Sequence, residues 1–242
     1  MVMDLQTLVL DFDGTLAPIR KDPSAVRLPK AMRGVLLKLV SSGLEVIILS
    51  GRSTQFLEEQ DFPGEVWLRG NFGNASSARK AVFGKRFMRT LAIISRIRGI
   101  KVERKAGYTI HYRNVRQGDL ERAKQLIYLA IDEAGDGASS VFGRKAVEIL
   151  PPGNRPKIGF LLRLLDSRKE GVLFIGDDPS DRAAMMALSG RANFSCALVK
   201  SREVDAWEGK WPAKLVSRGA LASFLLRIAE RRGRGHGKAM PL

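Results

Sequence analysis

The hydrophobic positions of the chain follow two alternating patterns. Short apolar runs predict buried strands at 8–10, 45–49 and 66–68. Apolar residues recur at helical spacing from Pro29 to Gly43, and a shorter helix is expected from Ser53. Strands that alternate with helices in this way favour a parallel sheet with right-handed crossovers.

The pattern changes near Ser76. From there to about Gly153 we expect two helices, the second ending at Gly135, and four short strands at 100–104, 108–113, 139–142 and 146–150. The first of these helices runs over roughly 85–98. Paired strands with helices between them indicate a small α+β module with an antiparallel sheet, and 70–73 and 151–153 are its expected hinges.

The strand and helix alternation then resumes. We expect a helix at 157–165, a strand at 172–175, a helix from Arg182, a strand at 197–199 and a last amphipathic helix at 221–228. The expected organisation is an α/β core with a parallel sheet and helices on both faces at 1–75 and 154–232, an inserted module at 76–153, and a basic disordered tail at 233–242.

The composition narrows the class of protein. The 242 residues contain no apolar run near the ~18 residues that a membrane span needs. Asp4 precedes the first apolar run without a basic leader, so we expect no signal peptide and a cytoplasmic protein. Cys196 is the only cysteine, which excludes an intrachain disulfide and a zinc cluster, and its apolar neighbours indicate a buried thiol.

The charge is strongly positive. The formal net charge is +16, and Glu103 is the only acid between Arg79 and Arg113. Such a field attracts anions, either phosphorylated metabolites or nucleic acid, and does not choose between them. A solvated basic face without a partner is the alternative interpretation.

Polar side chains follow three of the predicted strands. They are Asp11 and Asp13 after the first, Ser50 after the second, and Asp177, Asp178 and Asp181 after a later one. Ligands of open parallel sheets bind at the carboxyl ends of the strands, so we expect these side chains to converge. Several carboxylates in one pocket need a cation, and Mg²⁺ prefers oxygen ligands.

These residues suggest a division of labour. Asp11 is the candidate nucleophile and Asp13 the general acid and base. Ser50 and the backbone of Gly51 would hold phosphoryl oxygens, and Lys157 would offset the charge of the phosphoryl group. Expected metal ligands are Asp11, Asp13 and Asp177, with Asp178 and Asp181 supporting them.

The order of these motifs resembles that of the haloacid dehalogenase-like phosphatases. The matching segments are Asp-Phe-Asp-Gly-Thr-Leu at 11–16, Ser50, Lys157 and Gly-Asp-Asp-Pro-Ser-Asp at 176–181. The resemblance implies a Rossmann-like core, dependence on Mg²⁺ and hydrolysis of a phosphomonoester through a phosphorylated Asp11. It also implies that the module at 76–153 is a cap.

Further segments look like those of the trehalose-phosphate phosphatases. They are Ser-Gly-Arg at 50–52, 102–105 with 111–113, and 147–153. By this resemblance Arg52, Asn71, Arg113 and Glu148 would contact the substrate. The chain departs from the family pattern at four positions: Phe72 stands where a histidine is usual, Ile158 follows the lysine, Arg182 replaces a glutamate, and Leu150 replaces a basic residue.

The expected function is hydrolysis of trehalose 6-phosphate by a monomer or small homo-oligomer without a membrane partner. Alternatives are a phosphatase for another sugar or polyol phosphate, of the sucrose-phosphate or glycosyl-glycerate type, and a basic nucleic-acid-binding protein on the same scaffold. The complete set of catalytic residues argues against a protein that only binds.

Overall fold

The computed structural model describes residues 4–20, 22–73, 83–104, 107–143, 145–152, 157–200 and 214–233. The chain divides into two compact units, each described by itself below. The core unit consists of Met1–Gly73 and Lys157–Leu242, and the cap unit is Asn74–Pro156. The predicted hinge residue Gly153 and the basic tail from residue 234 onward lie outside the described residues.

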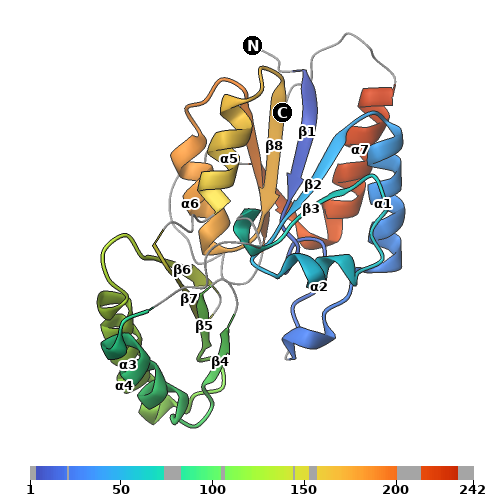
Figure 1. Cartoon of the computed structure of the whole chain (residues 1–242). Helices are drawn as coiled ribbons and strands as arrows, with labels where there is room; N and C mark the ends of the chain where they lie inside the picture. The colour runs from blue at the N-terminus through green and yellow to red at the C-terminus, as the bar shows by residue number, and fades with distance from the viewer. Residues whose placement is uncertain are drawn as a thin grey trace. The chain divides into compact units, whose positions relative to one another are not determined.

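A six-stranded parallel sheet forms the centre of the core unit (Figure 1). Its order is β10-β9-β8-β1-β2-β3. The strands are β1 (Leu5–Leu10), β2 (Glu45–Leu49), β3 (Trp67–Arg69), β8 (Gly171–Gly176), β9 (Phe194–Lys200) and β10 (Lys214–Ser217). The predicted α/β class with a parallel sheet is therefore confirmed.

Helices cover both faces of this sheet (Figure 1). Helices α1 (Lys30–Ser41) and α7 (Leu221–Gly233) pack on one face, and α5 (Lys157–Asp166) and α6 (Pro179–Leu188) pack on the other. Because side chains alternate along a strand, β1 sends Leu8 and Leu10 to the first layer and Val9 to the second. Helix α2 (Thr54–Glu58) links β2 to β3.

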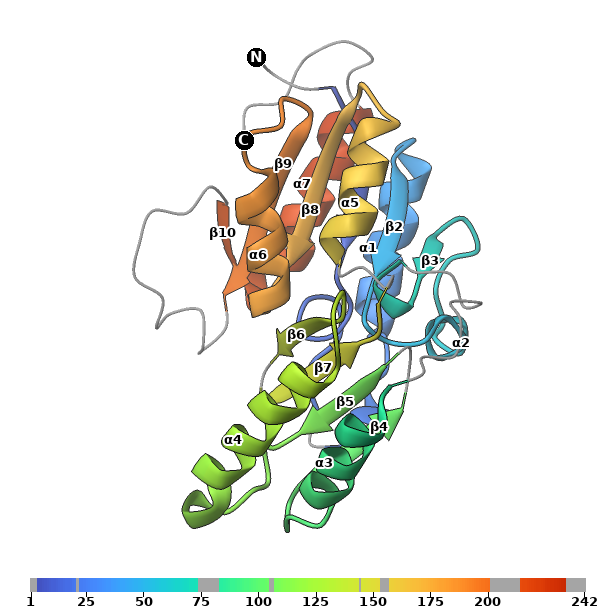
Figure 2. The same ribbon diagram turned by 60° about the vertical axis from the view of Figure 1, so that its left-hand side comes forward.

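The cap unit is an antiparallel sheet with helices on one face (Figure 2). Its strand order is β4-β5-β7-β6, and its elements are α3 (Lys85–Ser95), β4 (Lys101–Arg104), β5 (Tyr108–His111), α4 (Gln117–Glu133), β6 (Ser139–Gly143) and β7 (Ala146–Leu150). Phe87 and Ile94 of α3 and Ile127 of α4 pack against Ile110 and Ile149 of the sheet. The predicted small antiparallel module is confirmed.

Helix α6 and strand β10 differ most from the prediction. Helix α6 begins at Pro179, three residues before the expected Arg182, because the Asp178 side chain accepts a hydrogen bond from the backbone of Asp181 and caps the helix. Strand β10 was not predicted, since four residues at a sheet edge carry too short an apolar signal.

Cys196 lies buried in β9, as expected, and burial raises the pKa of its thiol to about 11. Within the described ranges we find no helix with the length and apolar content of a membrane span.

Candidate active site

The site begins where β1 ends. Asp11 follows the strand, is 4% exposed, and its backbone N–H donates to the carbonyl of Ile175 in β8 at 2.8 Å. Gly14 turns the chain with φ +89°, and a Cβ there would lie 2.1 Å from Oδ2 of Asp177. Glycine is therefore required at this position both for the backbone conformation and for the approach of the carboxylate.

The loop after β8 and the first turn of α6 each supply a further buried carboxylate, Asp177 and Asp181. Oδ2 of Asp181 accepts the backbone N–H of Asp177 at 3.0 Å and that of Asp178 at 3.2 Å. Thr15 donates its hydroxyl to Oδ1 of Asp177 at 3.1 Å, which joins the loop after β1 to the loop after β8. These contacts fix both carboxylates before any ligand binds.

Lys157 is the first residue of α5 and is buried with these acids. Its Nζ lies 2.5 Å from Oδ1 of Asp11 and 2.6 Å from Oδ1 of Asp181. Burial alone would lower the pKa of Lys157, but the charges of Asp11 and Asp181 outweigh burial and hold that pKa well above its usual value. The lysine is therefore a fixed positive charge.

Burial has the opposite effect on the acids. It raises the pKa of Asp11 to about 8, although the charge of Lys157 acts to lower it. Burial and the charge of Asp178 raise the pKa of Asp181 well above its usual value. Burial also acts to raise the pKa of Asp178, but Lys157 and a hydrogen bond from Ser180 bring it below its ordinary value.

This arrangement fits a divalent cation. Asp11, Asp177 and Asp181 each offer an oxygen, and the three oxygens lie within 4.8 Å of one another. Once Asp11 and Asp181 have lost their protons, the three carboxylates and Lys157 carry two negative charges in excess, which a divalent cation balances. Carboxylate oxygens are the ligands that hard cations prefer.

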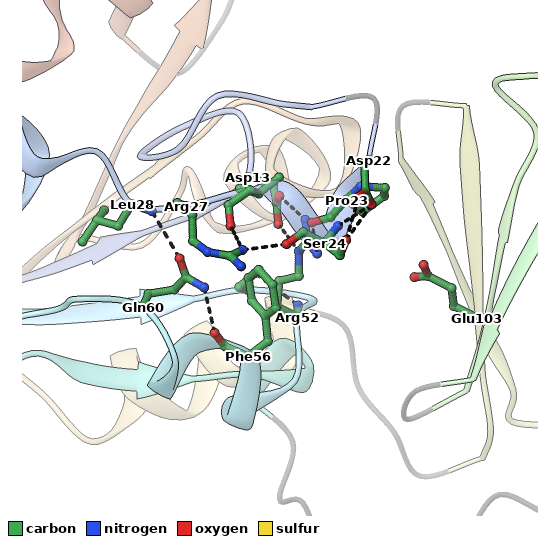
Figure 3. Close-up of polar contacts among 12 residues, drawn as sticks. Asp13, Asp22, Pro23, Ser24, Arg27, Leu28, Arg52, Phe56, Gln60 and Glu103 are labelled. Carbon is green, nitrogen blue, oxygen red and sulfur yellow. Dashed lines mark hydrogen bonds and ion pairs between the residues drawn. The ribbon is translucent and has the colours of Figure 1, made fainter.

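Asp13 is held by an arginine of the loop after β2 (Figure 3). Arg52 donates to both carboxylate oxygens of Asp13, from Nε to Oδ2 at 2.7 Å and from Nη2 to Oδ1 at 2.6 Å. Nη1 of the same arginine donates to the carbonyl of Pro23 at 2.9 Å, and the guanidinium lies 4.3 Å from the ring centre of Phe56. Asp13 is outside the three-carboxylate cluster found among the described residues, so its role as a metal ligand stays a prediction.

The loop after β2 is held by a tight turn that follows β3. Ser50 is buried, and its hydroxyl accepts the backbone N–H of Arg52 at 3.2 Å. The turn residues Asn71 and Phe72 both have positive φ, and their N–H groups donate to the carbonyls of Arg52 at 2.7 Å and Ser50 at 2.8 Å. A Cβ on Gly51 would lie only 2.8 Å from the nearest atom of the Phe72 ring, so the ring occupies the space that a side chain at position 51 would need.

The remaining predicted residues belong to the cap unit. Arg113 is exposed just beyond β5, and Glu148 is buried in β7, paired in register with Thr109 of β5. Their contact with a sugar stays a prediction. The sequence interpretation gave no role to Thr15 or Phe72, although both contact residues of the site. Thr15 could have been found from its place two residues after Asp13. For Phe72 the only signal was that it stands where a histidine is usual.

Three comparisons with known proteins bear on this geometry. A family model described as trehalose-phosphatase matches residues 9–82. The trehalose-phosphate phosphatase of Mycobacterium avium is 26% identical over 250 residues, which cover 94% of this chain and 63% of the relative. The C-terminal domain of a trehalose-6-phosphate phosphatase from C. albicans superposes with a TM-score of 0.75 at 20% identity, covering 94% of this chain and 93% of that one.

A sugar phosphatase of haloacid dehalogenase subclass IIB superposes with a TM-score of 0.52 at 13% identity, over 91% of this chain and 99% of that one. The fold is that of the haloacid dehalogenase-like phosphatases. The family model and the curated relatives confirm the resemblance of the chain to trehalose-phosphate phosphatases. The chain spans less than two thirds of the length of the first curated relatives, at 63% of the Mycobacterium avium protein.

Proposed function

We propose that the chain is a Mg²⁺-dependent phosphatase that hydrolyses a sugar phosphate, trehalose 6-phosphate in particular. The observation that carries the proposal is the buried contact of Lys157 with Asp11 and Asp181 at the carboxyl ends of β1 and β8. The similarity to trehalose-phosphate phosphatases over most of the chain supports the choice of sugar.

Asp11 is the nucleophile of this mechanism. One of its carboxylate oxygens bonds to phosphorus while the bond from phosphorus to the sugar oxygen breaks, which leaves an aspartyl phosphate. Lys157 stands beside Asp11 and offsets charge on the transferring group. Bound at Asp11, Asp177 and Asp181, Mg²⁺ would supply further neutralisation of the phosphoryl oxygens.

Asp13 is the general acid and base of this mechanism. It gives a proton to the departing sugar oxygen and then takes one from the water that attacks the aspartyl phosphate, so inorganic phosphate leaves and Asp11 is regenerated. In this mechanism the hydroxyl of Ser50, which accepts the backbone N–H of Arg52, and the backbone N–H of Gly51 would contact the phosphoryl oxygens. The contacts between Arg52 and Asp13 keep this acid at the end of β1 between steps.

The test is a phosphate-release assay with the full chain and a panel of sugar phosphates in the presence of Mg²⁺. Trehalose 6-phosphate should be the best substrate, ahead of sucrose 6-phosphate, glucosylglycerate phosphate and glucose 6-phosphate. The Asp11→Asn variant should lose turnover of every compound while remaining folded, with a cooperative thermal unfolding transition. Chelation of Mg²⁺ should also stop the wild-type reaction.

Each result has a contrary outcome. A different preferred sugar would overturn the substrate and leave the reaction class intact. Near wild-type turnover by Asp11→Asn would overturn the nucleophile. Because an amide in place of this carboxylate cannot accept the phosphoryl group, that variant should also fail to incorporate ³²P from a labelled substrate after acid quench, whereas the wild type should become labelled.

A further inference from the structure

The outer face of α3 in the cap unit is unusually basic. Six exposed cations lie on this helix, on the turn that follows it and at the cap of α4: Lys85, Arg86, Arg89, Arg96, Arg98 and Arg116. Among the described residues none of the six has an ion pair with an acid. We call these six residues the basic cap surface.

Helix geometry aligns three of these cations. At about 100° per residue, Lys85, Arg89 and Arg96 fall within roughly 40° of one another around the axis of α3. Eleven residues at about 1.5 Å each spread them over roughly 16 Å. The opposite side of the helix is accounted for, because Phe87, Leu91 and Ile94 are buried in the cap core.

The far end of the surface is fixed by a close backbone contact. Gly99 has φ +94°, and a Cβ there would lie 2.1 Å from the carbonyl oxygen of Asn114. This contact holds the turn that carries Arg96 and Arg98 against the segment that leads to Arg116, the residue that precedes α4. Arginines from two parts of the sequence therefore share one end of the cap unit.

The stability of α3 does not explain Lys85 and Arg86. Its first turn contains Lys85 and Arg86 and no acid, and its N-cap, Gly84, makes no side-chain hydrogen bond. Cations at a helix N-terminus oppose the helix macrodipole, so these two residues act against the stability of α3. Two cations at this unfavourable position, without an ion pair to any acid among the described residues, indicate that the surface binds an anionic partner.

We propose that the basic cap surface binds the phosphate backbone of nucleic acid, independently of the phosphatase reaction. Five of the six cations are arginines, whose planar fork matches phosphate oxygens. A duplex carries about one phosphate charge per 1.7 Å of its axis, so a row of cations roughly 16 Å long faces several phosphates. The exposed residues of α3 include no aromatic ring for base stacking, so contact is with the backbone and independent of base sequence.

An anionic membrane is the less favoured partner. Met88 and Ile93 are exposed on α3, but they flank the row of cations on opposite sides. Insertion into a membrane surface needs a continuous apolar face, and the continuous apolar face of α3 is buried in the cap core.

The test measures binding of the full-length protein to a fluorescently labelled DNA duplex of about 20 base pairs by anisotropy, at several NaCl concentrations between about 50 and 200 mM. The key variant is the triple change Lys85→Gln, Arg89→Gln and Arg96→Gln. A matched control changes three exposed helical cations of the core unit, Lys30→Gln, Lys38→Gln and Arg227→Gln, and so removes the same net charge.

The wild type should bind the duplex with micromolar affinity. The negative slope of log K against log[NaCl] should become shallower by about two to three in the key variant, because each lost phosphate contact removes about 0.9 from its magnitude. Affinity at the lowest salt should drop at least about tenfold. The control should keep the wild-type slope to within about one contact. Thermal unfolding checks that both triple variants are folded.

Three results would overturn the proposal. One is absence of duplex binding by the wild type at low salt. Another is an equal loss in the key variant and the control, which would mean attraction by net charge alone. The third is binding to phosphatidylserine vesicles that depends on the three cations while duplex binding does not. None of these results bears on phosphate release, so they leave the proposed phosphatase activity untouched.

Discussion

At the scale of single residues, the pair formed by Arg52 and Asp13 changes how the site is understood. The resemblance assigned Arg52 to the substrate, but its Nε and Nη2 both donate to the carboxylate of Asp13. Its Nη1 reaches the carbonyl of Pro23, and the Phe56 ring supports the guanidinium plane. Such a bidentate contact fixes orientation as well as charge. We propose that Arg52 acts through Asp13, while its contact with the substrate stays a prediction.

We therefore expect the Arg52→Lys variant to lose turnover rather than affinity. A lysine keeps the charge but cannot hold both oxygens of Asp13, so kcat should fall by about 10- to 100-fold while KM changes less than about threefold. The measurement is steady-state phosphate release with the best sugar phosphate. Arg33→Lys, which alters an arginine paired with Asp61 away from the site, should behave like the wild type. A rise in KM with unchanged kcat would instead support direct substrate binding by Arg52.

Asp11 gives the site a dependence on pH. Burial raises its pKa to about 8, against the lowering effect of Lys157. Below about pH 8 a cation must displace the proton of Asp11, and above that pH it need not. The folded-state pKa lies above the usual 3.8, so the stability linked to this proton is present at low pH and is lost as pH rises through 8.

The metal-free protein should therefore melt at a lower temperature at about pH 9 than at about pH 7, and Mg²⁺ should restore the difference. Mg²⁺ affinity should rise by about tenfold per pH unit up to about pH 8 and then level off. Thermal unfolding in chelator and in Mg²⁺, at each pH, measures both effects. In Asp11→Asn the Mg²⁺ shift should be small and flat with pH. A wild-type shift that shrinks as pH rises would contradict the model.

The residues of the cluster could be named from the sequence because parallel strands bring their carboxyl ends together. Asp11 and Asp177 were found in this way, and Lys157 was found from its place at the start of a helix after the Pro-Pro-Gly segment. The position of Asp181 was harder to predict. It depends on the capping of α6, which turns this carboxylate back toward Lys157 instead of leaving it at the edge of the site. The partner of Asp13 could not be predicted, since nothing in a sequence fixes which arginine side chain reaches a given acid.

At the scale of elements, the turn after β1 determines whether the strand ends can meet. Gly14 adopts a conformation that other residues rarely take, and the space of its missing Cβ is filled by the carboxylate of Asp177. The strands themselves place Asp11 and Asp177 in neighbouring positions because β1 and β8 pair in parallel. The turn then allows the two loops to close against each other.

The Gly14→Ala variant tests this requirement. Positive φ and the clash with Asp177 should together destabilise the fold by about 1–3 kcal/mol, and displacement of the carboxylate should lower the stabilisation by Mg²⁺. Chemical denaturation with and without Mg²⁺ measures both. Gly34→Ala is a matched control, since a Cβ there meets no atom within 4 Å in α1, and it should be neutral or stabilising by up to about 1 kcal/mol. Equal behaviour of the two variants would remove the role given to the turn.

Most elements were predictable because their hydrophobic period is strong. Strands β2 and β7 have the predicted bounds, and α3 and α4 bury the apolar face that their spacing indicates. Failures lie where a signal is short or comes from a side chain rather than from periodicity. Strand β10 has four residues, and the start of α6 depends on one hydrogen bond to Asp178.

At the scale of the whole molecule, the positive charge has two consequences that can be separated. With 41 basic and 25 acidic residues, the chain carries an excess of positive charges that repel one another. This repulsion destabilises the compact folded chain more than the expanded unfolded chain. The buried contacts of Lys157 with Asp11 and Asp181 are shielded from solvent ions. Salt should therefore weaken the repulsion much more than it weakens the site.

We accordingly expect the melting temperature to rise as NaCl increases from about 10 to 300 mM, over which the Debye length falls from about 30 Å to well below 10 Å. The control triple variant Lys30→Gln, Lys38→Gln and Arg227→Gln carries three fewer positive charges, so its melting temperature should be higher at low salt and should rise less with NaCl. Calorimetry in chelator, which removes the contribution of a bound cation, measures both. If the melting temperature fell with salt in the wild type, surface ion pairs such as that of Arg168 with Glu45 would outweigh the repulsion, and the excess charge would have no net cost for folding.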